Sequence, residues 1–560
     1  MTISENILNI FLSFLRAILS FISPILVKKI LDSASLYNKS GESIFKYFIL
    51  FFIALLCIYS VDFILSKIKL VFSFIFKTQE QKILYEELLE VKYESFYKNG
   101  ASYYVYRISQ FINELFMTLS SYLSSVLISA FTIVVSLFFL FKGSFILFFV
   151  GLILLPLNYF GYKKINYKLL EKSKILQEKS ASNFNEIINF VSNFETIKQF
   201  LNFGRLIKIL GNNFENIENA HNDINVYAQK TSLLLSFIID FFKNFILMYL
   251  IYLFWNGNIY FSDLIFLNMI FSVYTSGLSE LNKININLRD LKVGLHFVKE
   301  DILKHKERNE GKLQLNQVNS IDINLDGFRY DKKLAIDSIN LSFKSGKKYG
   351  IVGSSGCGKS TLVKLLVRLY ESNGISINGK EINEYSLKTL RNKIFLLPHT
   401  PQVFPVSIKQ NILIGAEDSE IKRYKNLTDM SFLKEISDKH DFETTIISSG
   451  VNLSNGEKQA ICAARVFIKN PDIIIFDEAT SAMDSRLEDL FVKDLENIKD
   501  YGNKTFIFIS HRLSTIKKCD EIIFMENKKI GKIFRSYADA ICDEKFVKLY
   551  ESQLKAEKYY

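Results

Sequence analysis

Two short runs in the second half of the 560-residue chain have residue types that suit the binding of phosphates. The first run has the spacing Gly-x-x-x-x-Gly-Lys-Ser, in which the glycines let backbone amides turn toward a β-phosphate. Its lysine supplies a positive charge and its serine a hydroxyl for Mg²⁺. The run and the residue after it are Gly353, Ser354, Ser355, Gly356, Cys357, Gly358, Lys359, Ser360 and Thr361.

The second run is apolar and ends in two carboxylates. Residues 473–476 are Ile-Ile-Ile-Phe, which is typical of a strand buried on both faces, and Asp477 and Glu478 follow it. Carboxylates at the end of such a strand are expected to lie close to the phosphate loop. The two runs together predict a site for ATP with Mg²⁺.

Local patterns indicate which elements position the phosphate loop. Residues 349–352 form a short apolar run, as expected of a strand that leads into the loop, and residues 361–368 have helical spacing. The phosphates are therefore expected to sit at the N-terminus of a helix, where free amides and the helix dipole favour anions.

The first half of the chain contains long apolar segments near residues 7–31, 44–66, 119–141, 144–162, 232–255 and 262–284. Each is close to the roughly 20 residues that cross a bilayer, so six membrane spans are expected. Arg16 lies in the first span and Asp240 in the fifth. A charge at that depth favours a place on a translocation path, with snorkelling to the interface as the alternative.

Charge placement predicts the orientation of the chain. The long connections after the second and fourth spans carry many lysines, whereas the short connections carry few. The positive-inside rule then puts the long connections and the ATP half on the cytosolic or matrix side. Basic loops beside anionic membrane lipid account for the net charge of +11, so no nucleic acid partner is expected. The five cysteines form no Cys-x-x-Cys pair, which argues against a disulfide framework and a zinc site.

The chain is expected to divide into a membrane domain at 1–300, a charged linker at 301–315 and a nucleotide-binding domain at 316–560. Apolar residues on one face of the long connections predict that membrane helices continue into the aqueous phase.

Further motifs make residues 7 to 535 resemble a half-size exporter of the ATP-binding-cassette (ABC) family, B-type. The resemblance implies a six-helix membrane domain followed by an α/β P-loop domain. It also implies that Tyr330 stacks on adenine, Asp477 helps to hold Mg²⁺ with Ser360, and Glu478 polarises the attacking water. His511 matches the switch histidine that contacts the γ-phosphate, and Asp484 belongs to the loop between two sites, which begins at Ser481.

The family signature Leu-Ser-Gly-Gly-Gln is matched, with two departures, by Leu453, Ser454, Asn455, Gly456 and Glu457. In this family the signature completes the ATP site of the opposite subunit. One copy of each motif therefore implies a dimer of half-transporters, most simply a homodimer, with a heterodimer of related chains as the alternative.

A third departure is His399, which falls where the family has a glutamine that contacts Mg²⁺ or water. A neutral imidazole can make one hydrogen bond there, but a protonated imidazole would repel Mg²⁺, so slow or pH-sensitive turnover is expected. Gln402 is close enough in sequence to be an alternative.

Short runs at 193–200, 261–268 and 289–290 look like the mitochondrial iron–sulfur and heavy-metal-tolerance branch. That branch implies a small-molecule cargo such as a glutathione-linked sulfur, iron–sulfur precursor or metal–thiol species. A lipid or peptide exporter, and an ATP-regulated channel or receptor with weak hydrolysis, are the alternatives. An organelle inner membrane and a plasma membrane both stay open, because no presequence is visible.

Overall fold

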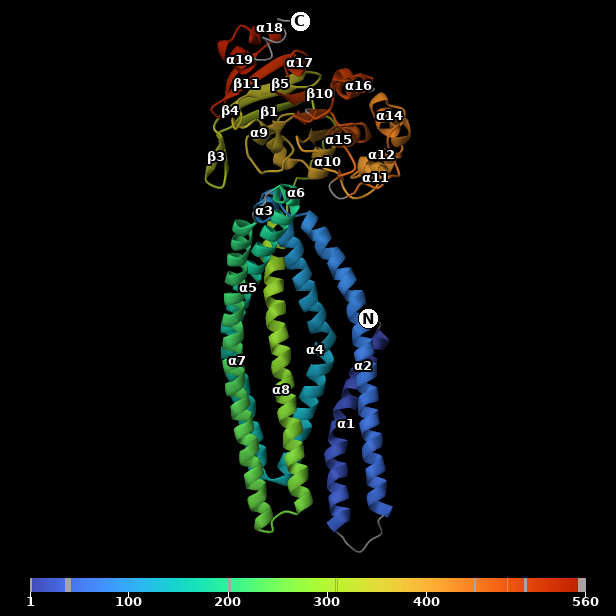
Figure 1. Ribbon diagram of the computed structural model, residues 1–560, viewed down its shortest axis with the longest axis vertical. Helices are drawn as coiled ribbons and strands as arrows, with labels where there is room; N and C mark the ends of the chain where they lie inside the picture. Colours follow the sequence, from blue (N-terminus) through green and yellow to red (C-terminus); the bar gives the residue numbers. More distant parts are fainter. Residues whose placement is uncertain are drawn as a thin grey trace. The chain divides into compact units, whose positions relative to one another are not determined.

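A computed structural model of the protein describes residues 3–35, 42–199, 203–307, 309, 311–447, 450–480, 482–497 and 501–551. The chain forms two compact units, Met1–Glu307 and Arg308–Tyr560 (Figure 1). The division falls inside the stretch 301–315 that the charge pattern marks as a linker. Ser481 of the loop between sites lies outside the described residues.

The first unit is helical. Its long helices are α1 (Ile3–Ser35), α2 (Glu42–Leu89), α4 (Ala101–Gly143), α5 (Phe145–Ser192), α7 (Gly204–Trp255) and α8 (Phe261–Phe297). Short helices α3 (Tyr93–Asn99) and α6 (Phe194–Lys198) join them, and η1 (Val298–Ile302) and η2 (Leu303–His305) end the unit. Within the described residues, six helices are long and apolar enough to cross a membrane, as predicted.

Three of these helices are much longer than a bilayer requires. The helices α2 and α5 have 48 residues each and α7 has 52. At 1.5 Å per residue they are about 70 to 80 Å long, against a hydrocarbon core of about 30 Å. Helices of this length agree with the predicted continuation of the membrane helices into the aqueous phase. α4 and α8 run side by side at the centre of the unit, and a cluster of large apolar side chains that includes Phe271 and Tyr274 packs there.

The second unit is built around a six-stranded sheet in the order β12-β11-β5-β10-β9-β8. β5 (Lys348–Gly353), β8 (Ile394–Leu397), β9 (Ile473–Asp477), β10 (Thr505–Ile509) and β11 (Glu521–Glu526) are mutually parallel, and β12 (Lys529–Phe534) is antiparallel to β11. Parallel strands end at the same edge of a sheet, so the residues that follow β5, β9 and β10 meet there. β9 is buried along its whole length, which its unbroken apolar run predicts.

A second sheet has the order β4-β1-β6-β7, and the strands β2 and β3 form a separate two-stranded hairpin. The bounds are β1 (Ser320–Leu325), β2 (Phe328–Tyr330), β3 (Lys333–Ile336), β4 (Ile339–Lys344), β6 (Ile375–Ile377) and β7 (Lys380–Glu381).

The helices of the second unit are α9 (Lys359–Leu366), α10 (Leu387–Lys393), α11 (Ile408–Leu413), α12 (Asp418–Ile421), α13 (Tyr424–Leu427), α14 (Ser431–Ser437), α15 (Asn455–Lys469), α16 (Ser485–Glu496), α17 (Leu513–Ile516), α18 (Tyr537–Ala540) and α19 (Glu544–Leu549), with short turns η3 (Ile382–Glu384) and η5 (Tyr501–Asn503).

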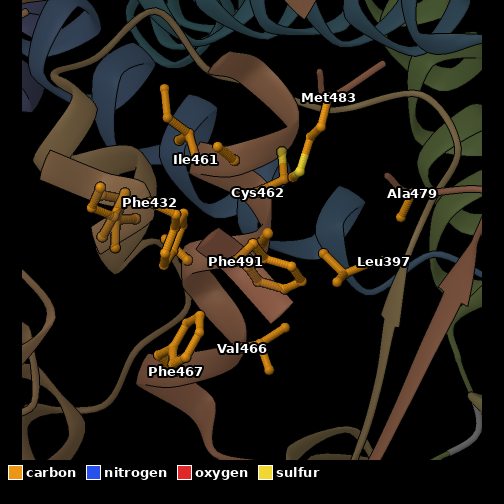
Figure 2. Close-up of a cluster of buried hydrophobic side chains, with 14 of the residues drawn as sticks. Leu397, Phe432, Ile461, Cys462, Val466, Phe467, Ala479, Met483 and Phe491 are labelled. Carbon is orange, nitrogen blue, oxygen red and sulfur yellow. The ribbon is translucent and has the colours of Figure 1, made fainter. Parts of the chain in front are cut away.

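A buried cluster fixes α15 against its neighbours (Figure 2). Phe467 of α15 packs between Phe432 of α14 and Phe491 of α16, with ring centroids 5.4 and 5.9 Å away. Phe476 of β9 contacts Phe491 at 6.1 Å. Because close-packed aromatic rings leave little freedom, the C-terminal part of α15 and the end of β9 are held in a defined relation through Phe491.

Candidate functional site

The phosphate loop leaves β5 at Gly353 and enters α9 at Lys359. Gly353 has φ of 153°, and a Cβ there would lie 2.2 Å from the carbonyl oxygen of Met525. Gly358 has φ of 105°, and a Cβ there would lie 2.9 Å from the carbonyl oxygen of Ala335. Only glycine tolerates both the left-handed backbone and the close approach, so the spacing of the motif has a steric cause.

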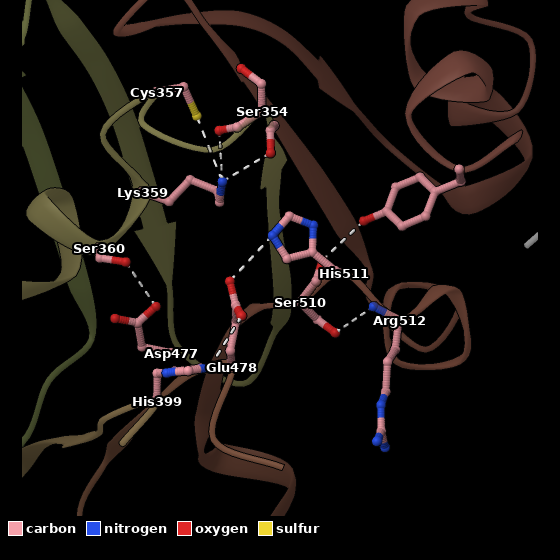
Figure 3. Close-up of polar contacts among 12 residues, drawn as sticks. Ser354, Cys357, Lys359, Ser360, His399, Asp477, Glu478, Ser510, His511 and Arg512 are labelled. Carbon is pink, nitrogen blue, oxygen red and sulfur yellow. Dashed lines mark hydrogen bonds and ion pairs between the residues drawn. The ribbon is translucent and has the colours of Figure 1, made fainter. Parts of the chain in front are cut away.

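The two polar side chains of the loop make the contacts shown in Figure 3. The ammonium of Lys359 donates to the carbonyls of Gly353 at 2.9 Å and Ser354 at 3.0 Å. The hydroxyl of Ser360 donates to the carboxylate of Asp477 at 3.0 Å. Burial raises the pKa of Asp477, and the hydrogen bond from Ser360 opposes that rise. The start of α9 and the end of β9 thus bring together two oxygen ligands of the kind that Mg²⁺ prefers.

Glu478 lies between two histidines. Its Oε1 is 3.2 Å from Nε2 of His511, and its Oε2 is 3.8 Å from Nε2 of His399. Its amide donates to the carbonyl of Ile509 at 3.0 Å, and its φ is 53°. A left-handed backbone in a residue other than glycine is unfavourable, and such residues concentrate at functional sites. His511 and His399 both reach the carboxylate that the sequence singled out.

A cavity of about 310 Å³ brings the predicted nucleotide residues together. Tyr330 lines it, and its hydroxyl lies 3.1 Å from the hydroxyl of Thr361 at the start of α9. Lys333 in the hairpin and Lys528 in the turn between β11 and β12 also line it. The motifs do not predict these two lysines, because they reach the cavity only through the packing of separate turns. The full lining is Tyr330, Lys333, Leu334, Ala335, Ser355, Gly356, Gly358, Lys359, Ser360, Thr361, Glu478, His511 and Lys528.

The signature segment forms the start of α15. The hydroxyl of Ser454 accepts from the amide of Glu457 at 3.2 Å, and the carboxylate of Glu457 accepts from the amide of Ser454 at 2.8 Å. This reciprocal pair is a capping box, which either glutamate or the family's glutamine can form. Burial opposes ionisation of Glu457, but hydrogen bonds from Ser454 outweigh it and lower the pKa.

The remainder of the signature is placed around this cap. Leu453 is buried, Asn455 is exposed, and a Cβ on Gly456 would lie 3.0 Å from the carbonyl oxygen of Ala482. Among the described residues, those that line the cavity include none of the signature. Asp484 caps α16, since its carboxylate accepts from the amide of Leu487 at 2.8 Å.

His399 and Gln402 are distinguished by their contacts. Gln402 contributes its carbonyl oxygen, which accepts from Arg465 at 3.0 Å and from the thiol of Cys462 at 3.3 Å. The side chain that lies near Glu478 is that of His399.

The two charges in the membrane spans have different surroundings. Arg16 of α1 pairs with Asp62 of α2 at 2.7 Å. Asp240 is exposed on α7, and its carbonyl accepts from Asn244 at 2.9 Å. Sequence patterns place Asp62 in the second span but cannot show that it meets Arg16.

Comparison with known proteins gives matches over both units. The family described as "ABC transporter transmembrane region" matches residues 6–278, and the family described as "ABC transporter" matches residues 336–481. The chain is 32% identical over 289 residues to the "Iron-sulfur clusters transporter ATM1, mitochondrial" of Saccharomyces cerevisiae, covering 49% of this chain and 41% of that protein. It is 35% identical over 216 residues to the "Multidrug resistance protein 1" of Entamoeba histolytica, covering 36% and 16%.

Among solved structures, a bacterial Atm1-family ABC exporter with ATP bound is similar over 98% of both chains, with a TM-score of 0.86 and 20% identity. At that identity the likeness shows the shared fold. The aligned stretches cover less than half of the two curated relatives. Two family matches show that the chain belongs to the ABC transporter family, with a transmembrane region followed by an ATP-binding domain, and the described residues contain six helices long and apolar enough to cross a membrane.

Proposed function

We propose that the chain is an ATP-driven exporter that works as a dimer of half-transporters. One observation carries the proposal: the phosphate loop, Glu478 and His511 line a single cavity in a chain that also crosses the membrane. A carboxylate held 3.2 Å from an imidazole next to a phosphate loop suits hydrolysis of the nucleotide, because water can be polarised there. Binding alone would not require that pair.

Ser360 and Asp477 fit Mg²⁺. They present a hydroxyl and a carboxylate oxygen 3.0 Å apart, and the raised pKa of Asp477 is what a bound cation would reverse. When bound with ATP, Mg²⁺ neutralises charge on the phosphate oxygens. Lys359 adds a second positive charge, and its present contacts with two loop carbonyls can be exchanged for phosphate oxygens.

Glu478 and His511 have distinct roles in this proposal. Glu478 takes a proton from the attacking water, and His511 orients that carboxylate through the contact at Oε1. Tyr330, beside Thr361, offers an aromatic face to the adenine. Lys333 and Lys528 add positive charge to the same cavity and favour an anionic ligand.

The position of the signature supports the proposed dimer. Ser454 caps α15 but does not line the cavity of its own chain among the described residues. In the proposed dimer, the signature acts on ATP bound by the second chain. A second copy is the simplest source, because this chain has one set of every motif.

The proposed cargo is a small thiol species, such as a glutathione-linked sulfur, an iron–sulfur precursor or a metal–thiol compound. Support comes from the similarity to the yeast protein named as an iron–sulfur cluster transporter. Asp240 is exposed on α7, and its carboxylate would repel an anionic thiol peptide such as a glutathione-linked cargo, so a lipid or another peptide is the alternative cargo. The lysine-rich connections place the ATP-binding unit on the cytosolic or matrix side of an organelle inner membrane or a plasma membrane.

The test is the variant Glu478→Gln in the full chain, purified into lipid. Phosphate release should fall by about 100-fold or more, while Mg²⁺-dependent ATP binding is retained. Glu443→Gln serves as the matched control, since Glu443 is an exposed carboxylate paired with Lys409 at 2.7 Å. Unchanged phosphate release from Glu478→Gln would remove Glu478 from its proposed role.

A second candidate function, an ATP-regulated channel or receptor with weak hydrolysis, is favoured by His399. Its imidazole lies 3.8 Å from Glu478 and can compete with water for that carboxylate. In that case the natural protein binds ATP with phosphate release near background, and His399→Gln raises the rate. Brisk hydrolysis that cargo stimulates would exclude this candidate.

A further inference from the structure

The side chain of His511 is held only in part by burial. The imidazole is half exposed, with 50% of its surface accessible, so burial does not fix its orientation. His511 lies just after the carboxyl end of β10, beyond the residues that pair with the neighbouring strands of the sheet. The backbone on either side of His511 therefore contributes to its direction, together with the contact with Glu478.

The peptide group before His511 is anchored from outside the loop. The hydroxyl of Tyr550, at the end of α19, donates to the carbonyl of Ser510 at 3.0 Å. That carbonyl belongs to the peptide bond whose nitrogen is the amide of His511. Because a peptide group is planar and rigid, holding its oxygen also fixes the nitrogen and limits the direction of the Cα–Cβ bond that follows.

Tyr550 is itself immobile. Its side chain is 1% exposed and its ring lies 5.0 Å from that of Phe546, which is fully buried. Salt bridges tie α19 to the sheet, from Lys532 of β12 to Asp543 at 2.6 Å and from Lys545 to Glu526 of β11 at 2.6 Å. Burial raises the pKa of the Tyr550 hydroxyl, so it remains a proton donor at physiological pH.

The residue after His511, Arg512, is held by its own contacts. The amide of Arg512 donates to the hydroxyl of Ser510 at 3.0 Å, and its guanidinium pairs with Glu488 of α16 (Figure 3 shows Ser510, His511 and Arg512). Glu488 also accepts from the hydroxyl of Thr480, two residues after Glu478, at 2.8 Å. The residues on both sides of His511, Ser510 and Arg512, are thus held by contacts with other elements. Through Glu488, Arg512 is also connected to the segment that carries Glu478.

We propose that Tyr550 is a positioning residue for the hydrolysis of ATP, acting through the Ser510 carbonyl to hold the His511 imidazole against Glu478. The proposal rests on the function proposed above for His511 and Glu478. It extends the site to the C-terminal helix, which contributes nothing to the lining of the nucleotide cavity among the described residues. It also predicts that changes at the end of α19 alter turnover without altering nucleotide affinity.

The test is Tyr550→Phe, which keeps the ring and removes only the hydroxyl. In the full chain in lipid, kcat for phosphate release should fall by about 3- to 10-fold, the size expected for one lost hydrogen bond, with KM for ATP unchanged. The matched control is Tyr385→Phe. Tyr385 is also buried and donates to a backbone carbonyl, that of Ile377, at 2.9 Å, but neither Tyr385 nor Ile377 lines the cavity or adjoins His511 in the sequence. Both variants lose a similar bond, so only Tyr550→Phe should lose kcat.

A double variant separates positioning from general destabilisation. If Tyr550 acts through His511, Tyr550→Phe has no further effect on single-turnover hydrolysis once His511→Ala has been introduced. An equal loss in both backgrounds, an unchanged kcat, or a raised KM with unchanged kcat would each overturn the proposal. If instead the role proposed for His511 in hydrolysis is wrong, His511→Ala hydrolyses ATP at the wild-type rate. That result distinguishes failure of the proposed function from failure of the proposal for Tyr550.

Discussion

The ion pair between Arg16 and Asp62 allows a quantitative test of the membrane unit. At 2.7 Å, in an effective dielectric of about 20, the two charges attract each other by about 6 kcal/mol, and the cost of desolvation offsets much of that. Removing one partner leaves a single charge within a span. We therefore expect Arg16→Leu and Asp62→Leu each to lower the free energy of unfolding by about 3 kcal/mol.

The double variant Arg16→Leu with Asp62→Leu removes both charges, and we expect it to cost only about 1 kcal/mol. Unfolding by SDS titration in mixed micelles, followed by far-UV circular dichroism, measures all three variants. Lys82→Leu is the control, because Lys82 and Glu86 form an exposed pair 3.8 Å apart on the same helix as Asp62, and such a pair contributes little. A double variant that costs the sum of the two single variants would refute the pairing.

The same double variant tests whether Arg16 lies on a translocation path. If the ion pair only joins α1 to α2, a stable double variant keeps cargo-stimulated ATP hydrolysis. Loss of that stimulation with normal stability would place Arg16 on the path that the sequence suggested.

Glu457→Ala should lower the free energy of unfolding of the full chain by about 1 kcal/mol, whereas Glu457→Gln should stay near wild type because it preserves the capping box with Ser454. Because folding lowers the pKa of Glu457, the stabilisation by its carboxylate is fully present above pH 4.5, the ordinary pKa of the group. That stabilisation is lost as the pH falls through the pKa of the folded state. Urea titrations of both variants at neutral and acidic pH measure the loss. Gly353→Ala should abolish binding of a fluorescent ATP analogue, because its Cβ would meet the carbonyl of Met525. His399→Gln should raise phosphate release by about 3- to 10-fold, since it removes an imidazole that can engage Glu478; an unchanged rate would show that His399 does not limit turnover.

Motifs within one short segment could be predicted from the sequence with their chemistry. The phosphate loop needs glycine for reasons of local backbone geometry, and the apolar run before Asp477 marks a buried strand. The capping box of Ser454 and Glu457 has the spacing Ser-x-x-Glu, so it could also have been predicted from the sequence. Comparison with the family signature instead marked Glu457 as a departure from glutamine.

Contacts between distant segments could not be predicted in the same way. Arg16 meets Asp62 because α1 packs along α2, and Lys528 reaches the cavity because the turn after β11 lies beside it. Tyr550 meets Ser510 only after α19 has docked on the sheet. None of these pairs leaves a spacing signal, since each depends on how whole elements pack.

The central claim, that ATP hydrolysis at this site drives transport, is tested most directly in vesicles. The protein is reconstituted with its ATP-binding unit outside, and accumulation of labelled glutathione disulfide is measured beside labelled lipid and peptide. We predict ATP-dependent accumulation of one of these probes by the wild type and none with ADP or with Glu478→Gln. Accumulation that is the same with ATP, with ADP and in Glu478→Gln would contradict the claim.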